Sequence, residues 1–451
     1  MKINIILIIL LLTCLLGGQS FGKKIQVNSE TNYIVGTERP YNTLKPGDTI
    51  LLMAGNRPYI CLKDVKGSAG HPIVVMNGGG VVTVNTDHYF GVKIAGCRYL
   101  RFTGTGDPKH FYGFSISRVA NGAGVSIGDL SSDIELDHCY IAHTKIQGLF
   151  AKTDPDCSLE SARNNFTQYN TIIHDNYLDY TGNEGMYIGS SFYTGETFKC
   201  HGKDTVIFPS DLVGVHIYNN IVNHSGWDGI QVGCAVKDCS IHNNIIMYDS
   251  QEGVPDQMSG IMFGGGTYAD VYCNYIAYGK GDAIDCFGLG GRIFNNIIIN
   301  PGYKYYPGNK SYPKHGMYLG DVSVVPGNSF HILFNDIINP KDAGIYFASI
   351  KSARNLVANN VIINPGGGSN RYIVTNSINV IEKNNFFSMK IADAGFTVDT
   401  TYRLLKTSRL IDAGYSDNKG ITTDYFGHPR PQGNGFDIGA VEFGSGSQPV
   451  K

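Results

Sequence analysis

Charged residues are scarce in this chain of 451 residues, since only 16% are Asp, Glu, Lys or Arg, and the formal net charge is -2. This balance gives no basic footprint for nucleic acid, and no polybasic or amphipathic stretch indicates a membrane surface. No apolar run is long enough for a comfortable membrane span. The cysteines form neither paired CxxC motifs nor a Cys/His spacing typical of zinc. The sequence therefore argues against nucleic-acid binding, a membrane span and a zinc site.

Helical amphipathic stretches of any size are also missing, whereas the chain is rich in glycine (57) and tyrosine (28). Segments such as VHIYNNIVN and RIFNNIIIN are β-branched and aromatic, and glycine interrupts them every few residues. These features favour strands over the helices of an α-solenoid. The length is ample for one elongated all-β core.

Asparagine recurs in one local setting, just before an apolar pair. The members are Asn176, Asn220, Asn244, Asn274, Asn296, Asn335 and Asn360, at intervals of 22 to 44 residues, and a last partial coil holds Asn385. A fixed local pattern with a variable period is typical of a solenoid whose coils carry loops of different length. Asparagine suits a turn in such a coil, because it tolerates left-handed backbone and its amide both donates and accepts. Stacked at about 4.8 Å per coil, these side chains predict a buried hydrogen-bonded ladder.

On this pattern the chain resembles, from roughly Lys24 to Phe443, the right-handed parallel β-helix proteins of the pectate-lyase-like superfamily. The resemblance implies an all-β fold, a single-stranded right-handed parallel β-helix (solenoid) of roughly 10–12 coils with loop insertions flanking one sheet.

The domain boundaries follow from composition. Lys2 and the apolar run after it indicate a signal peptide over residues 1–22, cleaved after Gly22. We expect the β-helix over 23–399 and a flexible tail over 444–451. Residues 400–443 resemble a closing segment common in bacterial β-helix proteins, which implies a cap over the open final coil. Cys14 could instead accept a lipoprotein anchor, but Thr13 before it is a poor match. We expect an exported protein, either secreted, periplasmic or on the cell surface.

Nine cysteines remain after cleavage. Cys139, Cys273 and Cys286 fall at the ladder or at inward strand positions, which predicts buried thiols. Either Cys157 with Cys200 or Cys234 with Cys239 could form a disulfide in an oxidising compartment. Sequence alone leaves this choice open.

A second repeated signature, of the type GMYIG, follows the first six of these recurring asparagines, at Gly185, Gly229, Gly260, Ala283, Gly316 and Gly344. The long insertions, residues 152–169, 190–213, 250–258 and 301–314, fall on the two corners that flank these strands. Loops rising on both sides of one parallel sheet predict a groove, where binding chemistry usually collects.

Two columns of side chains are predicted at this groove. The outward strand positions form the first: Phe150, Tyr187, Gln231, Met262, Asp285, Tyr318 and Tyr346. Sugar rings pack on π surfaces, and our candidates for substrate binding are Tyr187, Tyr318 and Tyr346, together with Gln231 and Trp227. The alternative is that tyrosine merely suits outward β positions.

The second column precedes the strands: Gln147, Glu184, Asp228, Ser259, Asp282 and His315. Acids aligned at one corner repel one another unless a cation or shared proton offsets their charge, although Asp and Glu also cap exposed turns. Coil spacing predicts Glu184 about 5 Å from Asp228, near the separation of a retaining glycosidase pair, and Asp228 roughly 9.6 Å from Asp282, near the inverting range. Trp227 beside Asp228 could raise the pKa of that carboxyl by desolvation.

The opening segment, with KPGDTI and GSAGHPI, resembles the polysaccharide lyase family of chondroitinase B and alginate lyases. That resemblance implies β-elimination from a uronic-acid chain, with a basic residue and bound Ca²⁺. Glu184, Asp228 and Asp282 offer hard oxygen ligands for such an ion, and the candidate bases are Lys314, His315, Lys152, Lys199 and His201. The segment EGMYIGSS departs from the family motif, with Tyr187 and Ser190 where further acid and lysine belong, so no catalytic residue is carried over.

Three functions remain open at this point: a polysaccharide lyase, which the resemblance favours; a glycoside hydrolase using Glu184, Asp228, Asp282 or Asp285; and a non-catalytic carbohydrate-binding surface protein. The catalytic candidates are Glu184, Asp228, Asp282, Asp285, Lys314 and His315. We expect a monomer that takes a poly- or oligosaccharide, with Ca²⁺ as its one candidate cofactor. Fold resemblance does not identify the substrate.

Overall fold

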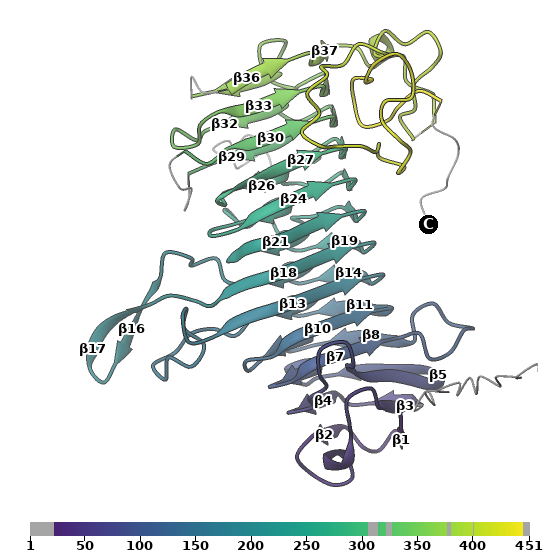
Figure 1. The fold of residues 1–451 in the computed structure, drawn as a ribbon, viewed down its shortest axis with the longest axis vertical. Coiled ribbons are helices and arrows are strands. Elements are labelled where there is room, and N and C mark those ends of the chain that lie inside the picture. Colours follow the sequence, from purple (N-terminus) through teal and green to yellow (C-terminus); the bar gives the residue numbers. More distant parts are fainter. Residues whose placement is uncertain (1–21, 305–313, 322–326, 377–379, 400, 445–451) are drawn as a thin grey trace, which may run out of the picture.

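The computed structural model describes residues 22–304, 314–321, 327–376, 380–399 and 401–444. Over these residues the chain winds into a right-handed parallel β-helix whose coils stack along one long axis (Figure 1). Two short 3₁₀ helices, η1 (Tyr41–Thr43) and η2 (Ile391–Ala394), interrupt the strands. The predicted fold class is therefore confirmed. The predicted signal peptide lies outside the described residues, except for Gly22.

One face of the β-helix, called sheet B here, contains 12 parallel strands, one per coil, which agrees with the predicted number of coils. Its strands are β2 (Tyr33–Val35), β4 (Ile60–Lys63), β6 (Phe90–Ala95), β9 (Ala123–Gly128), β12 (Leu149–Ala151), β15 (Met186–Ile188), β20 (Ile230–Val232), β23 (Ser259–Phe263), β26 (Asp282–Cys286), β29 (Met317–Leu319), β32 (Ile345–Phe347) and β35 (Ile373–Thr375).

The remaining faces form sheet A, with 23 strands in two parallel rows that meet at the asparagine corner. The row before the corner contains β1 (Lys24–Val27), β3 (Thr49–Arg57), β5 (Ile73–Thr86), β7 (Arg98–Thr103), β10 (Ser132–Asp137), β13 (Thr167–His174), β18 (Asp211–Tyr218), β21 (Ala235–His242), β24 (Tyr268–Tyr272), β27 (Gly290–Phe294), β30 (Phe330–Leu333), β33 (Asn355–Ala358) and β36 (Val380–Lys383). The row after it contains β8 (Phe114–Val119), β11 (Cys139–Thr144), β14 (Tyr177–Thr181), β19 (Ile221–Ser225), β22 (Ile245–Met247), β25 (Tyr275–Ala277), β28 (Ile297–Ile299), β31 (Asp336–Ile338), β34 (Val361–Ile363) and β37 (Phe386–Ser388).

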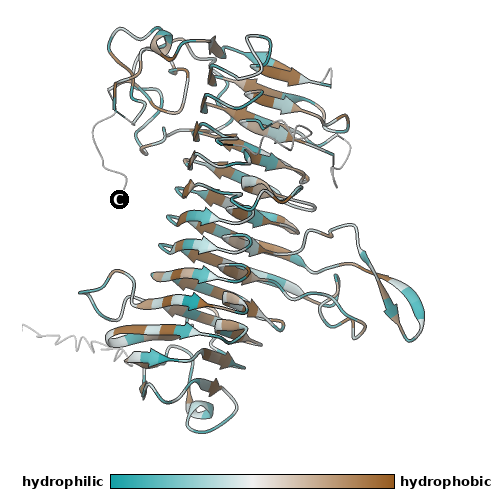
Figure 2. Ribbon diagram, turned by 180° about the vertical axis from the view of Figure 1, so that it is seen from behind, coloured by the Kyte–Doolittle hydropathy of each residue, from teal (hydrophilic) through white to brown (hydrophobic). Residues whose placement is uncertain are grey.

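The core runs along the axis of the solenoid and is built by alternation on each strand. Figure 2 shows hydrophobic and hydrophilic residues alternating along many strands. The inward positions predicted for sheet B are buried in every case, from Met186 and Ile188 to Ile345 and Phe347. Burial of these apolar side chains at each coil is the main stabilising contribution, at about 25 cal/mol per Å².

The asparagine ladder is present as predicted. Each amide donates to the oxygen of the next asparagine: Asn220 Nδ2 lies 3.0 Å from Asn244 Oδ1, and Asn244 Nδ2 lies 3.0 Å from Asn274 Oδ1. Cys139 occupies the equivalent position one coil earlier, and its N–H donates to Asn176. One detail of the prediction is wrong. The left-handed backbone belongs to the residue before each ladder asparagine, such as Asn219 (φ 56°) and Asn243 (φ 55°).

The glycines of the GMYIG signature allow neighbouring coils to approach closely. A Cβ at Gly185 would lie 2.5 Å from the carbonyl oxygen of Gly229, and one at Gly229 would lie equally close to the oxygen of Gly260. No side chain fits there without moving the backbone.

The C-terminal segment, residues 401–444, packs along the flank of the preceding coils (Figure 1). Its contacts reach far from the final coil, because Asn295 donates to the carbonyl of Thr423 and the N–H of Ala440 donates to Asp336. The predicted role as a cover for the open end is therefore too narrow. Side chains of this segment and of β28, β31 and β34 share a second apolar cluster.

The insertion of residues 190–213 projects from the body as a hairpin, with β16 (Glu196–Cys200) paired to β17 (Lys203–Ile207) (Figure 1). The Cys157–Cys200 disulfide ties it to the neighbouring insertion. Cys234 and Cys239 are free and buried, so the first of the two predicted pairings is confirmed. Within the described residues, no helix has the length and apolar character needed to cross a membrane.

Candidate active site on sheet B

The outward column of sheet B has the predicted register. Phe150 pairs with Tyr187, then Gln231, Met262, Asp285, Tyr318 and Tyr346 follow, one per coil. Residues from six successive strands after β12 thus form one line, although the chain positions span almost 200 residues. The insertions 152–169 and 190–213 follow strands of sheet B and the insertion 250–258 precedes one, so they lie on both sides of this line. Most of the predicted insertion 301–314 lies outside the described residues.

The middle of this column is covered. Ser191, from the insertion after β15, bonds both to the Tyr187 hydroxyl (3.0 Å) and to the Gln231 amide (2.5 Å). Gln231 is only 2% exposed and Met262 is 9% exposed. The expectation that Gln231 lies open for substrate is therefore wrong, because this loop turns back over the sheet.

Aromatic side chains at the two ends of the column are partly exposed. The rings of Tyr318 and Tyr346 lie 5.6 Å apart, and the Tyr346 hydroxyl accepts a hydrogen bond from Asn376. At the other end, the ammonium of Lys152 lies 4.4 Å from the centre of the Tyr187 ring. Both ends thus offer π surface next to a hydrogen-bonding or charged group.

The corner column is buried, which removes the alternative of acids capping an exposed turn. Glu184 is 2% exposed, Asp228 is 1% and Asp282 is 5%. The register places Glu184 and Asp228 in adjacent coils, and Asp228 and Asp282 two coils apart, as predicted. Burial of several carboxyls in one place is costly unless protons or partners offset the charge.

Asp228 has partners on one oxygen only. Its Oδ1 accepts from the N–H and the hydroxyl of Ser259, each at 2.7 Å, while Oδ2 is buried and has no partner among the described residues. Burial raises the pKa of Asp228 to about 8. Burial also raises the pKa of Glu184, which the Gln147 amide contacts at 3.0 Å.

Asp282 and Asp285, on the same strand β26, lie in different environments. Asp282 is paired with the ammonium of Lys314 at 3.1 Å and also accepts the N–H of His315. The pKa of Asp285 lies well above its ordinary value, because of burial first and the charge of Asp282 second. The Oδ1 atom of Asp285 has no partner among the described residues, although the side chain is partly exposed.

His315 is 1% exposed, and its Nδ1 accepts the N–H of Ala343 at 3.2 Å. Burial lowers the pKa of this imidazole, which favours the neutral ring at pH 7. Because Nδ1 already accepts a backbone proton, the neutral tautomer carries its hydrogen on Nε2.

Asp249 was missed in the sequence. It lies at the start of the 250–258 insertion, is 1% exposed, and its charge acts on both Asp228 and Asp285. Burial raises its pKa to about 6. Its only sequence signal was an acid at the boundary of a flanking insertion.

Two of the predicted bases lie away from this site. Lys199 and His201 are exposed on the β16–β17 hairpin, which points away from the body (Figure 1). Trp227 is half-buried at the corner just before Asp228, where its N–H donates to the carbonyl of Asn183.

The predicted calcium ligands do not form a coordination shell. Glu184, Asp228 and Asp282 bond to separate partners, and no three acidic, histidine or cysteine ligand atoms on sheet B gather within 4.8 Å in the described residues. A group that does so comprises Glu135, Asp137 and His174 on sheet A. The guanidinium of Arg101 already pairs with both carboxylates of this group, at 3.1 Å from Glu135 and 2.9 Å from Asp137. Sheet B therefore does not fit the expected Ca²⁺.

Fold and site together define a right-handed parallel β-helix protein with a buried acidic centre on one sheet. No protein-family model matches the chain, and no curated protein does. Among solved structures, the chain resembles the GH136 lacto-N-biosidase from Eubacterium ramulus, with a TM-score of 0.56 and 14% identity over 82% of this chain and 68% of that protein. A second structure of the same enzyme, the native protein, gives a TM-score of 0.53, over 77% of this chain and 63% of its length. Pectate lyase Pel9A covers 94% of this chain at 14% identity and a TM-score of 0.45. At such identities the likeness concerns the fold.

Proposed function

We propose that this protein is an exported carbohydrate-active enzyme that hydrolyses glycosidic bonds at the acidic centre of sheet B. The observation that carries the proposal is the contrast between two carboxyls of strand β26. Burial and a neighbouring charge favour the protonated form of Asp285, while Asp282 is paired with Lys314. A carboxyl that favours its protonated form, next to a second carboxyl that is paired with an ammonium, is an arrangement suited to acid–base cleavage of a glycoside.

In this proposal Asp285 is the general acid. It lies in the outward column and is partly exposed, and its raised pKa favours the protonated form, which can donate a proton to the leaving oxygen. Asp282 is the second carboxyl, held in place by Lys314 and the His315 N–H. It either receives a proton from the attacking water or attacks the sugar itself.

The site also favours a neutral sugar over a uronate. Among the described residues, Asp285 is influenced by the charges of three acids and one cation: Asp228, Asp249, Asp282 and Lys314. Because Lys314 is already paired with Asp282, it is not available to neutralise the carboxylate on each unit of a uronate polymer. Tyr318 and Tyr346, two adjacent rings along the column, provide the face on which a sugar ring would pack.

The lyase expected from the sequence resemblance is the second candidate. The observation in its favour is Lys152, whose ammonium lies over Tyr187 at the partly exposed end of the column. The ammonium of Lys152 could neutralise a uronate carboxylate, while Tyr187 in its phenolate form could accept the proton from the neighbouring carbon.

The name of the enzyme that the fold resembles, a GH136 lacto-N-biosidase, is consistent with the carbohydrate class. Export is supported by the disulfide Cys157–Cys200, because such bonds persist in oxidising compartments. The apolar N-terminal run provides the expected signal.

The test is a parallel assay of the mature protein on neutral oligosaccharides and on pectate and alginate. A hydrolase releases reducing ends without ultraviolet absorbance, whereas a lyase generates an absorbing double bond. Asp285→Asn should lower kcat by about 10²–10⁴-fold, because the amide cannot donate the proton. The matched control is Asp238→Asn, an exposed carboxylate on sheet A, which should leave the rate unchanged.

The lyase would be favoured over the hydrolase if the protein generated ultraviolet-absorbing products from uronates. In that case Lys152→Met should abolish these products and Asp285→Asn should retain them. Full activity of Asp285→Asn on a neutral substrate would refute the assigned acid. Addition of a chelator should have no effect on hydrolysis, since the sheet B carboxyls do not gather as metal ligands.

A further inference from the structure

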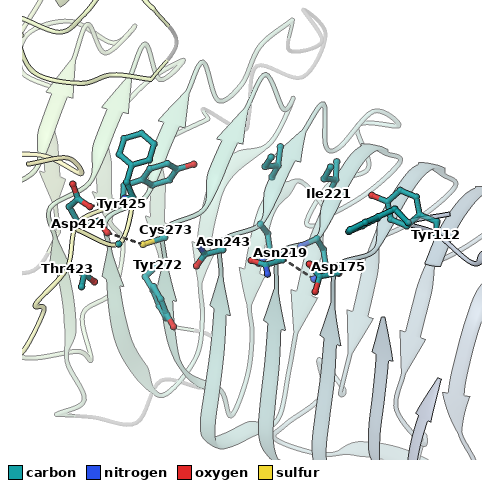
Figure 3. Close-up of a pocket in the computed structure, with 16 residues that line it drawn as sticks. Tyr112, Asp175, Asn219, Ile221, Asn243, Tyr272, Cys273, Thr423, Asp424 and Tyr425 are labelled. Carbon is teal, nitrogen blue, oxygen red and sulfur yellow. Dashed lines mark hydrogen bonds between the residues drawn. The ribbon is translucent and has the colours of Figure 1, made fainter. Parts of the chain in front are cut away.

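A cavity of about 600 Å³ lies on the opposite side of the molecule from sheet B, at the asparagine corner between the two rows of sheet A. Figure 3 shows Asp175, Asn219 and Asn243 in a row along its floor, with Tyr112 at one end and Tyr425 at the other. The turn Thr423–Gly427 of the C-terminal segment forms one wall. The volume is in the range of small-molecule sites.

The floor residues belong to a column on sheet A, distinct from the two columns of sheet B. It is composed of the residue before each ladder asparagine. Higher along the solenoid this column holds the C-terminal segment through hydrogen bonds to its main chain. Asn384 donates to the carbonyl of Ala413, Asn359 bonds both the carbonyl and the N–H of Tyr415, and Asn295 donates to the carbonyl of Thr423. These amides therefore face outward, in a position to bond a ligand that carries both donors and acceptors.

The C-terminal segment leaves the column at Thr423–Gly427, and the column continues beneath the cavity as Asn243, Asn219 and Asp175. Asn219 and Asn243 are exposed, and both have a left-handed backbone that points the amide outward. Asn243 Oδ1 is hydrogen-bonded to the His242 ring at 2.8 Å, and no described residue bonds the NH₂ group of Asn243. For Asn219 no side-chain hydrogen bond occurs in the described part of the chain.

The cavity is short, and its floor carries two amides and the carboxylate of Asp175, whose Oδ2 is hydrogen-bonded to His174 Nδ1 at 2.6 Å. The three floor residues span about 10 Å, because each coil rises roughly 4.8 Å. Phe111 and Tyr112 bound one end, and Tyr425 and Phe426 bound the other. A long polypeptide would have to pass these rings, whereas a short oligosaccharide fits between them and presents hydroxyls that both donate and accept.

We propose that this cavity is a second carbohydrate-binding site, which takes a short neutral oligosaccharide or a chain end without cleaving it. The inference rests on the proposed function for its ligand class. Asn219 and Asn243 bind sugar hydroxyls, and the aromatic side chains pack against the ring faces.

The test uses the full mature chain carrying Asp285→Asn, so that no probe is consumed. Binding of β-linked gluco-, xylo- and galacto-oligosaccharides of three to six units is measured by calorimetry. Asn219→Gly with Asn243→Gly removes both amides and keeps the left-handed backbone, which glycine adopts freely. The matched control is Asn339→Gly, another exposed asparagine of left-handed backbone (φ 52°) far from the cavity.

In the double variant, the oligosaccharide affinity of one class of site should fall at least about tenfold. Asn339→Gly should bind the oligosaccharides as the parent does. Turnover of a short substrate should be unchanged when Asp285 is restored. Equal binding by the double variant and the parent would overturn the inference, and so would a panel in which no oligosaccharide binds. Binding of an acetylated tetra-alanine amide in place of sugars would overturn it in favour of a peptide site. If this protein binds oligosaccharides in the cavity but cleaves no glycan, the proposed hydrolase is refuted and the binding site is retained.

Discussion

The buried carboxyl of Asp228 gives a prediction that can be worked from the structure in detail. Burial raises its pKa in the folded protein to about 8, whereas in the unfolded chain an aspartate titrates near 3.9. Between these two values the folded protein holds one more proton than the unfolded chain. The free energy of unfolding therefore falls by about 1.4 kcal/mol for each unit by which the pH rises across this range.

Asp228→Asn removes this dependence, because the carboxamide is neutral at every pH. Its oxygen can still accept both bonds from Ser259. The contribution of the Asp228 proton is fully present below about pH 4 and is lost as the pH rises through about 8, a total on the order of 5 kcal/mol. The variant should thus gain stability relative to the parent as the pH rises, and at pH 8 it should melt at a higher temperature.

The measurement is the melting temperature of both proteins by circular dichroism, at one scan rate, between pH 5 and pH 8. The difference between variant and parent should increase steadily across this interval. Asp204→Asn, which removes an exposed carboxylate of the β16–β17 hairpin, is the control. A difference that stays constant with pH, or that decreases, would show that Asp228 is not protonated in the folded protein.

Two further predictions concern packing between coils. Asn244→Ala removes four buried hydrogen bonds of about 3.0 Å to three neighbouring residues, so chemical denaturation should show a loss of roughly 3–6 kcal/mol. The exposed Asn339→Ala should cost about 1 kcal/mol, chiefly for its left-handed backbone, and equal losses would contradict a buried ladder. Gly279→Ala places a methyl group 1.8 Å from a carboxylate oxygen of Asp249, and we expect about 1–3 kcal/mol of destabilisation with reduced hydrolysis. Unchanged activity at full stability would mean that Asp249 has no part in the site.

Much of the fold could be predicted because its rules are local and repeat. The asparagine before each apolar pair, the alternation in strands such as GMYIG and the glycine of the same motif recur from coil to coil, so each coil repeats the same evidence. The register of the columns followed, since residues at equal positions in successive coils must stack. Glu184 and Asp228 were placed in adjacent coils by this argument alone.

The failures occurred where insertions leave the repeat. Nothing in the sequence of residues 190–213 indicates that Ser191 covers Gln231 while Lys199 is carried away on a hairpin. The path of the C-terminal segment along the flank is equally non-local, because Asn295 and Thr423 are 128 residues apart.

The sequence by itself thus determined the solenoid, its core and the vertical order of the acids, since these depend on a short pattern and on the fixed spacing of β-strands. Only the tertiary structure decided that the acids are buried, that Asp249 joins them and that Lys314 pairs with Asp282. The protonation state of a carboxyl depends on how much water and charge surround it, and those surroundings come from loops whose course no local pattern specifies.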